Sequence, residues 1–291
     1  MTGKFILNAD DFGSSKALNR AVLEAYDSGL LKSVSLIPNG DFFEEAVDNI
    51  LPKCPDIGVG IHLNLISGKS LCSDVDKLTG SDMKFSNNFF TLFAKLYNPK
   101  EKDILSQIER EFRRQIEKVL AKTKVSHIDS HAHIHSIPVI FDMVCRLAKE
   151  YGISEVRTHF EKFYFVPEIY GYINKDYFCN ALKKLMLNFF TIVNQNTVLK
   201  YGLSTNDYII GVGYASCMTP LAVMYGLNVL KKYKNITVET VIHPHRYDEG
   251  TINNHFDEYM LAKNNKLKDK ILSLGYDITN YIKNSENDGD K

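Results

Sequence analysis

The amino-acid sequence predicts a single-domain α/β protein, a (β/α) barrel. Short β-like runs alternate with longer amphipathic runs from one end of the chain to the other, with no visible linker between them. About seven or eight β/α units result, and such alternation indicates a parallel sheet. This many units without a break favours a closed or nearly closed barrel, either distorted or with fewer than eight strands, over separate domains. A doubly wound open sheet is the alternative fold.

The expected elements follow one another along one domain, residues 1–285, which ends in a polar tail at 286–291. The strands are expected at residues 4–9, 31–37, 56–65, 125–130, 153–159, 207–213 and 235–243, with a short last strand at 276–281. The helices are expected at residues 16–29, 41–51, 101–123, 138–152, 176–199, 221–234 and 256–274. In the first helix, Ser14 and Ser15 supply an N-terminal cap and Gly29 a stop.

Two insertions interrupt this rhythm, near residues 66–100 and 160–175. Both are rich in polar turn residues and aromatics, as in a lid or a platform on which a sugar ring stacks. The same aromatics would equally pack these segments onto the body or onto a second subunit. The sequence is therefore compatible with a homodimer but does not determine the oligomeric state. The aromatics are Phe85, Phe89, Phe90, Phe93, Phe163, Tyr164 and Phe165.

Composition and charge exclude several classes of partner. The 291 residues include 35 basic and 35 acidic ones. Because no run of like charge stands out, neither nucleic acid nor a membrane is an expected partner. The five cysteines are scattered and form no C-x-x-C pair, which indicates reduced thiols. No signal sequence and no apolar stretch of about 20 residues is visible, so we expect a cytoplasmic protein.

One stretch, HIDSHAHIH at residues 127–135, places four histidines and Asp129 at every second position. In an extended strand these five side chains share one face. One ion cannot bind all of them, because like-facing residues lie roughly 6.5 Å apart along a strand while metal–nitrogen bonds are about 2.1 Å long. Other ligands are therefore expected from elsewhere in the chain.

Further ionisable side chains follow the predicted strands, where the loops of a (β/α) barrel form the working face. They are Asp10 and Asp11 after the first strand, His62 and Asn64 at the third, Arg157 at the fifth, and His243 and His245 at the seventh. In an extended chain Asp10 and Asp11 face opposite sides, so one can hold a metal while the other handles a proton. Two imidazoles and one carboxylate around a divalent ion leave positions open for water and substrate, which is typical of a catalytic site.

With these motifs the sequence resembles the YdjC-like carbohydrate deacetylases, which are related in fold to the NodB-type polysaccharide deacetylases. The matching motifs are NADDFG at 8–13, GIHLNL at 60–65, HIDSHAHIH at 127–135 and IHPH at 242–245. The resemblance implies a barrel-like fold and one divalent metal ion, magnesium or zinc. It also implies hydrolysis of the N-acetyl group of an acetylated amino sugar such as a chitooligosaccharide.

The resemblance also implies roles for single residues. Asp11, His62 and His131 look like the metal ligands, Asp10 like the base and His243 like the acid. Arg157 is expected to orient Asp10 or to hold the departing acetate, and a salt bridge at the rim is an equal interpretation. The remaining site residues are expected to line or buttress the site; they are Asn64, His127, Asp129, His133 and His135.

Two other functions fit parts of the pattern. His131-Ala132-His133 is an H-x-H pair, as in the amidohydrolases and PHP-type phosphoesterases. Those families carry the pair on their first strand, whereas here the first strand ends in two acidic residues, which favours the deacetylase. A metal-dependent sugar-binding barrel without turnover is the non-enzymatic alternative, and the presence of both Asp10 and His243 argues against it.

Overall fold

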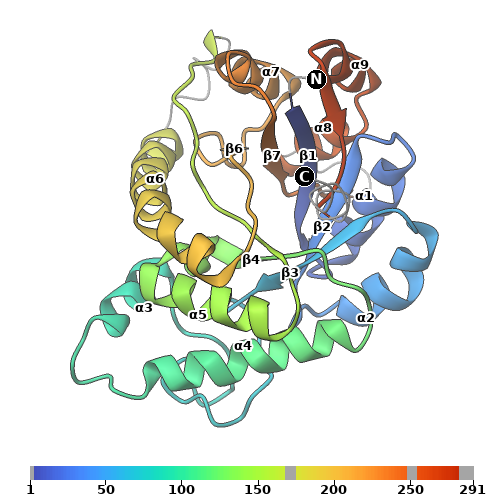
Figure 1. The fold of residues 1–291 in the computed structure, drawn as a ribbon. Helices are drawn as coiled ribbons and strands as arrows, with labels where there is room; N and C mark the ends of the chain where they lie inside the picture. Colours follow the sequence, from blue (N-terminus) through green and yellow to red (C-terminus); the bar gives the residue numbers. More distant parts are fainter. Residues whose placement is uncertain (1–2, 168–174, 248–253, 282–291) are drawn as a thin grey trace.

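A computed structural model describes residues 3–167, 175–247 and 254–281. Within these residues one parallel sheet curls through the centre of the molecule, and helices surround it (Figure 1). The strands are β1 (Gly3–Phe12), β2 (Leu31–Leu36), β3 (Gly58–Leu63), β4 (His127–Ser130), β5 (Glu155–Val156), β6 (Tyr208–Ile210), β7 (Ile236–Ile242) and β8 (Tyr276–Ile278). Their order is β5-β4-β3-β2-β1-β7-β6, and β8 pairs with β1 beside this path.

The ten-residue strand β1 organises the sheet. One edge of β1 pairs with β7 from Gly3 to Ala9. The other edge pairs first with β8, from Gly3 to Phe5, and then with β2, from Leu7 to Phe12. β8 thus fills the part of the edge that β2 does not reach.

The two ends of the strand order, β5 and β6, come close enough to make the barrel nearly closed. Val156 donates its backbone N–H to the carbonyl of Ser204 at 3.0 Å. Further along, the Asn206 side chain accepts from Thr158 N at 2.8 Å and donates to Thr158 O at 3.0 Å. An amide side chain thus replaces the hydrogen bonds that a neighbouring strand would make at this seam. The predicted distorted (β/α) barrel is confirmed.

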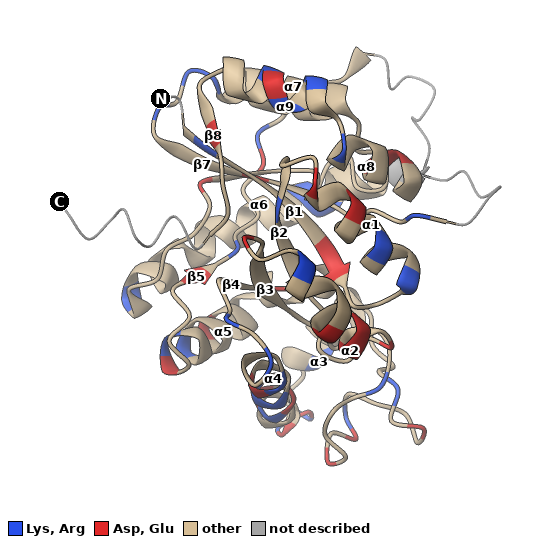
Figure 2. Ribbon diagram, turned by 90° about the vertical axis from the view of Figure 1, so that its right-hand side faces the viewer, with Lys and Arg blue, Asp and Glu red and all other residues tan. Residues whose placement is uncertain are grey.

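The helices cover the outside of the sheet. They are α1 (Lys16–Tyr26), α2 (Phe43–Glu45), α3 (Phe89–Leu96), α4 (Ile104–Leu120), α5 (Pro138–Glu150), α6 (Lys175–Tyr201), α7 (Pro220–Leu230), α8 (Asn254–Ala262) and α9 (Asn265–Ser273). Ser15 caps α1 as expected, accepting from Leu18 N. Acidic and basic residues are interspersed over most of these helices (Figure 2). In the described part of the chain, every helix is too short or too polar to cross a membrane.

Two helix predictions need correction. The helix expected at 41–51 is a single turn, α2, followed by a π-type turn, Ala46–Ile50, and a 3₁₀ turn, Leu51–Lys53, because Pro52 lacks the backbone N–H that a longer α-helix needs. The helix expected at 256–274 is two helices, since the Asn264 side chain accepts from Leu267 N and starts α9 anew.

The first insertion is fastened to the body. The buried Glu111 of α4 accepts hydrogen bonds from Leu71 N and Cys72 N, and α3, which the sequence did not predict, follows an Asn88 capping box. Phe85 is buried, whereas Phe90 and Phe163 are mostly exposed. In the second insertion, residues 168–174 lie outside the described residues, as does the predicted tail at 286–291.

Candidate active site

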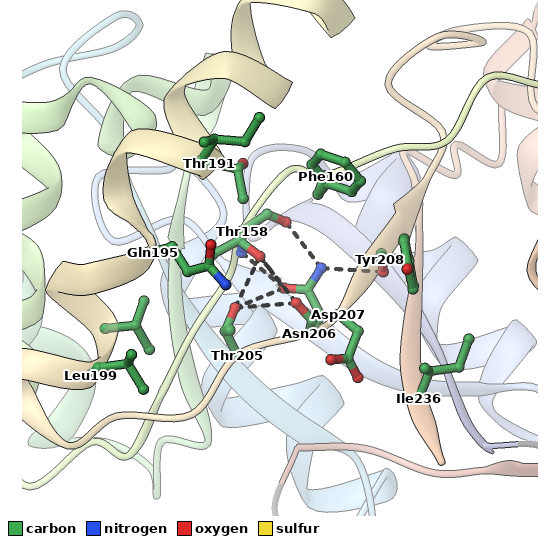
Figure 3. A pocket seen from close by; sticks show the side chains of 12 residues that line it. Thr158, Phe160, Thr191, Gln195, Leu199, Thr205, Asn206, Asp207, Tyr208 and Ile236 are labelled. Carbon is green, nitrogen blue, oxygen red and sulfur yellow. Dashed lines mark hydrogen bonds between the residues drawn. The ribbon is translucent and has the colours of Figure 1, made fainter. Parts of the chain in front are cut away.

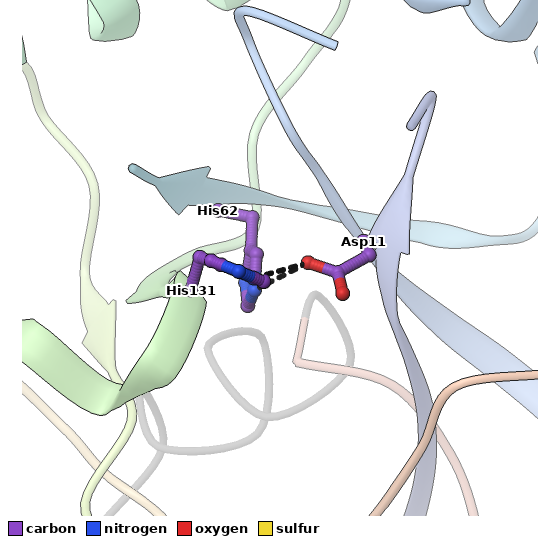
Figure 4. Close-up of side chains that lie close together, drawn as sticks. All are labelled: Asp11, His62 and His131. Carbon is purple, nitrogen blue, oxygen red and sulfur yellow. Dashed lines mark hydrogen bonds and ion pairs between the residues drawn. The ribbon is translucent and has the colours of Figure 1, made fainter. Parts of the chain in front are cut away.

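The three predicted metal ligands meet at the carboxyl ends of β1, β3 and β4 (Figure 4). Asp11 lies at the end of β1, His62 near the end of β3, and His131 directly after β4. Asp11 Oδ1 is 3.2 Å from His62 Nε2 and 2.7 Å from His131 Nδ1. Asp11 and His131 are partly exposed and His62 is buried, so the cluster opens to solvent on one side.

A local turn in the backbone brings both carboxylates of the Asp-Asp pair to the same histidine. Asp11 has a left-handed φ of 61°, and the β1–β2 register shifts between Ala9 and Phe12. Asp10 Oδ2 consequently lies 4.0 Å from His62 Nε2, close to the Asp11 contact. The expectation that the two side chains face opposite sides of an extended strand is wrong, because the strand is not extended at Asp11.

His62 is held from behind by Asp129. Its Nδ1 lies 2.6 Å from Asp129 Oδ1. Because a carboxylate only accepts, Nδ1 carries the proton of this hydrogen bond, and Nε2 faces Asp11. Burial alone would lower the pKa of His62, but Asp129 and Asp10 raise it to about 10. Burial would likewise raise the pKa of Asp11, but His131 and His62 hold it well below its usual value.

Arg157 follows β5 and lies fully buried under this cluster. Its guanidinium makes two hydrogen bonds of 2.8 Å to the Asp10 carboxylate. It also lies 2.6 Å from Asp129 Oδ2 and 2.6 Å from Glu239 Oε1. The guanidinium is therefore no rim salt bridge. Its geometry fits the expectation that it orients Asp10.

Glu239 and Tyr281, neither of which was predicted from the sequence, complete this buried charge cluster. The Tyr281 hydroxyl donates to Glu239 Oε2 at 2.6 Å. Burial raises the pKa of Glu239 in spite of the nearby Arg157. Glu239 is the one charged residue in the strand ITVETVI, and that exception was the signal that could have identified it.

The HIDSHAHIH segment is not one extended strand. β4 ends at Ser130, and a 3₁₀ turn follows over His131–Ser136, in which Ala132 and His133 have left-handed φ values. The common face expected for all five polar residues is therefore confined to His127 and Asp129. His127 is fully buried, stacks on Tyr281 and lies 3.2 Å from Ser35 Oγ.

His133 and His135 turn away from the Asp11 cluster. His133 Nδ1 lies 3.0 Å from His159 Nε2, so the H-x-H pair does not converge on one point. His135 Nε2 donates to the Arg157 carbonyl at 3.0 Å, and its Nδ1 accepts from Ser130 Oγ. Burial lowers the pKa of His135 to about 4 and that of His133 well below its usual value. These histidines are neutral supports for the turn that carries His131.

Asn64 organises the chain after β3. Its amide donates to Ser67 O at 2.7 Å and to Asn39 Oδ1 at 2.9 Å, and it accepts from Ile66 N. These contacts hold a turn, so the structure assigns Asn64 to the loop beside the site.

His243 follows β7 beside a buried acid from α8. Glu258 Oε2 accepts from His243 N at 2.5 Å and lies 3.7 Å from His243 Nδ1. Burial alone would lower the pKa of His243, but Glu258, with smaller contributions from Asp11 and Asp10, raises it to about 9. No sequence pattern points to Glu258, which lies fifteen positions further on, in a helix. His245 and His255 pack beside His243, and the Nδ1 of each lies 3.0 Å from the carbonyl oxygen of His243.

The donor set fits a divalent cation. Two imidazole nitrogens and one carboxylate, all within 4.8 Å of one another, are the ligand types of catalytic zinc sites and of related divalent-metal sites. The hydrogen bond from His62 to Asp129 is the carboxylate–histidine arrangement that orients a metal ligand. A second group, Asp10, His62 and Asp129, is also close together, but Arg157 already neutralises both of its carboxylates.

The family model for YdjC-like proteins matches residues 4–272. The chain belongs to the YdjC-like family. A carbohydrate deacetylase of Brevibacillus brevis is 40% identical over 151 residues, 52% of this chain and 57% of that protein, so the match spans little more than half of that relative. A carbohydrate deacetylase of Listeria welshimeri is 33% identical over 208 residues, 71% of this chain and 78% of that protein.

The fold of this YdjC-like chain also matches a solved structure. A protein from Enterococcus faecalis named for cellobiose-phosphate cleavage superposes with a TM-score of 0.72 over 97% of this chain and 99% of its own, at 21% identity. At this identity the likeness concerns the fold, and it supports the barrel described above.

Proposed function

We propose that the protein is a metal-dependent carbohydrate deacetylase that hydrolyses the N-acetyl group of an acetylated amino sugar, such as a chitooligosaccharide. The observation that carries this proposal is the meeting of Asp11, His62 and His131 at the strand ends of a YdjC-like chain, with Asp10 and His243 close by. The named activity of the relatives supports the same reaction.

In this proposal Asp11, His62 and His131 hold one divalent ion, magnesium or zinc. When bound, such an ion polarises a carbonyl oxygen and lowers the pKa of bound water. Asp11 and His131 are partly exposed to solvent, which leaves access for the acetamide of the substrate.

Asp10 is the proposed general base. Its carboxylate is held by both Arg157 hydrogen bonds and by Asn8 Nδ2 at 2.7 Å. A fixed carboxylate takes the proton of the attacking water without first reorienting, which is how positioning accelerates a proton transfer.

His243 is the proposed general acid. An amine leaves the tetrahedral intermediate readily only when it is protonated, so a charged imidazole is needed on the other side of the acyl carbon. The pKa of about 9 that Glu258 gives His243 keeps this side chain charged at neutral pH.

The test is acetate release from N-acetylglucosamine and from N-acetylated chitooligosaccharides, with and without a chelator. We expect free acetate, intact glycosidic bonds and inhibition by the chelator, because one metal and one aspartate base are not the paired carboxylates of a glycosidase. Cleaved glycosidic bonds without free acetate would overturn the reaction class. Ligand binding without turnover across the panel would favour the sugar-binding barrel.

A further inference from the structure

The last described residue, Tyr281, reaches into the barrel and touches the charge cluster under the candidate active site. Its side chain is fully buried, and its ring stacks on His127 with ring centroids 4.2 Å apart. Its hydroxyl donates to Glu239 Oε2 at 2.6 Å. The family match ends at residue 272, so Tyr281 lies outside the part of the chain that the match covers. None of the roles proposed above uses this hydroxyl.

The barrel leaves room for the segment that ends in Tyr281. The short strand β8 pairs with the start of β1 and leads the chain to this position. A Cβ atom at Gly58 would lie 2.9 Å from Asn280 Cβ, and one at Gly60 would lie 2.2 Å from His127 Nε2. Because a side chain at either glycine would collide with these neighbours, β3 provides the space that they occupy. A phenylalanine ring would fill the place of Tyr281 equally well, so packing does not explain the hydroxyl.

Glu239, the partner of this hydroxyl, holds a second edge of the Arg157 guanidinium. Glu239 Oε1 accepts from Arg157 Nε at 3.0 Å and from Nη2 at 2.6 Å. The Asp10 carboxylate accepts from Nη1 and Nη2 at 2.8 Å. A guanidinium is planar and its N–H donors point in fixed directions, so carboxylates on two edges fix its plane. Without Glu239, the contact with Asp10 alone would no longer fix that plane.

The backbone of Arg157 is fixed separately from its side chain. Arg157 N donates to Ile128 O of β4 at 3.0 Å. The next residue, Thr158, exchanges hydrogen bonds with the Asn206 side chain, and both residues line a cavity of about 500 Å³ beside α6 (Figure 3). Because the chain is held on both sides of Arg157, a change in the partners of the guanidinium alters the direction of the side chain and not the path of the backbone.

The Tyr281 hydroxyl favours the charged form of Glu239. Burial raises the pKa of Glu239, and Arg157, His127 and Tyr281 oppose this rise. A hydrogen bond to a carboxylate stabilises its charged form, and a charged carboxylate binds a guanidinium more strongly than a neutral one does. The acidic residues around the pair oppose a charged Glu239; they are Asp10, Asp129 and Glu155. The hydroxyl therefore supports the contact between Glu239 and Arg157.

We propose that Tyr281 is a positioning residue for the deacetylation: its hydroxyl holds Glu239 against Arg157, and Arg157 holds the carboxylate of Asp10 in place. The inference rests on the proposed function, since it needs Asp10 as the base. A buried ion pair that served stability alone is often replaced by apolar side chains of similar volume without loss. A carboxylate that has to point at one water molecule, in contrast, needs partners that fix its direction.

Steady-state kinetics of acetate release by the full, metal-loaded chain test the inference. Tyr281→Phe should lower kcat roughly tenfold with KM and metal content unchanged, because a slightly displaced base slows proton transfer but leaves substrate binding intact. An activated acetate ester should lose as much as the amide, since water attacks the acyl carbon in both. Glu239→Gln keeps the shape of Glu239 without its charge and should lower kcat at least as much.

The pH profile of kcat separates an effect through Glu239 from a general loosening of the fold. Without the hydroxyl the pKa of Glu239 rises, so Glu239 becomes neutral at a higher pH and the acid limb of Tyr281→Phe should move to higher pH. In a Glu239→Gln background, Tyr281→Phe should cause no further shift and no further loss of kcat, because the two residues act in one chain of contacts.

Tyr276→Phe is the matched control. Tyr276 lies in β8, and within the described residues its buried hydroxyl has no hydrogen-bond partner. Removal of this hydroxyl should leave kcat and the pH profile as in the wild type.

Circular dichroism and the melting temperature show whether each variant is folded. If Tyr281→Phe does not fold, Glu239→Gln decides the question, and a wild-type kcat in that variant overturns the inference. A folded Tyr281→Phe with wild-type kcat and an unmoved acid limb also overturns it, as does a Tyr281→Phe loss that persists in full in the Glu239→Gln background; both results leave the proposed function intact. A wild-type chain that releases no acetate from any amide or ester overturns the proposed function and this inference with it.

Discussion

Arg157 and Asp10 form a two-pronged ion pair inside the barrel, with both guanidinium–carboxylate distances at 2.8 Å. Neither residue is more than 2% exposed. The same guanidinium also contacts Asp129, which in turn holds His62. The proposed base and one proposed metal ligand are thus fixed by a single buried cation, which joins the ends of β1, β4 and β5.

Arg157→Leu should destabilise the protein by about 3–5 kcal/mol, because removal of one partner leaves buried carboxylates without a counter-charge. Denaturant unfolding monitored by circular dichroism measures this loss. The matched control is Arg113→Leu, which breaks a partly exposed pair with Glu150 and should cost no more than about 1 kcal/mol. An equal loss of unfolding free energy in both variants would show that the buried network contributes no more to stability than the exposed pair does.

His131→Ala should lose bound metal and nearly all deacetylation while the protein stays folded. His131 is partly exposed and belongs to the three-residue cluster, so its removal deletes a ligand without opening the core. Elemental analysis after dialysis measures the metal. His133→Ala is the control, since His133 contacts His159 instead, and it should keep its metal. Full metal content in His131→Ala would refute the ligand assignment.

Asp129→Asn should weaken metal binding by about 10- to 100-fold, the usual effect of removing the acceptor behind a histidine ligand. The Asn side chain keeps the shape of Asp129, but its neutral amide oxygen accepts a weaker hydrogen bond from His62 Nδ1 than the carboxylate does. Competition with a chelator of known affinity gives the dissociation constant. An unchanged value would mean that the Asp129–His62 contact has no influence on the ion.

The sequence predicted correctly which strand ends carry the polar residues of the site, but it did not predict the local backbone conformation. Polar residues after β1, β3, β4 and β7 do gather at one end of the sheet, because parallel strands put their carboxyl ends together. Alternation alone could not show that β4 ends at Ser130 or that Asp11 is left-handed. Such turns depend on packing with distant strands. Glu258 and Tyr281 were missed for the same reason, since only tertiary contacts bring them to the site.

Stability should fall as the pH drops from 6.5 to 5. Burial lowers the pKa of His135 from 6.5 to about 4, so in this range the unfolded chain binds a proton that the folded chain does not. The loss is about 2 kcal/mol over 1.5 pH units for this residue. His62 and His243 do not offset it, because groups with a raised pKa lose their contribution only above pH 6.5.

Urea unfolding at pH 5, 6 and 7 tests this dependence. His135→Gln should reduce the dependence without abolishing it, since the amide does not titrate but His133 and His159, whose pKa values burial also lowers, still do. If His135→Gln keeps the full wild-type slope, another group is responsible for the loss.

Replacement of His243 distinguishes an enzyme from a binding protein. As the proposed acid, His243 acts on turnover rather than on affinity, so His243→Ala should lower kcat by roughly 10² to 10⁴ with metal content unchanged. An activated ester of acetate has a leaving group that needs little protonation, and its hydrolysis should fall much less. Equal losses on amide and ester would remove His243 from the acid role.

Glu258→Gln probes the same residue through pH. The Glu258 carboxylate favours the charged imidazole, so its neutralisation should lower the pKa of His243. The alkaline limb of the kcat profile reports loss of the protonated acid, and in Glu258→Gln this limb should move to lower pH. A double variant, Glu258→Gln with His243→Ala, should show no such shift. An alkaline limb that stays in place in Glu258→Gln would mean that a different group donates the proton to the departing amine.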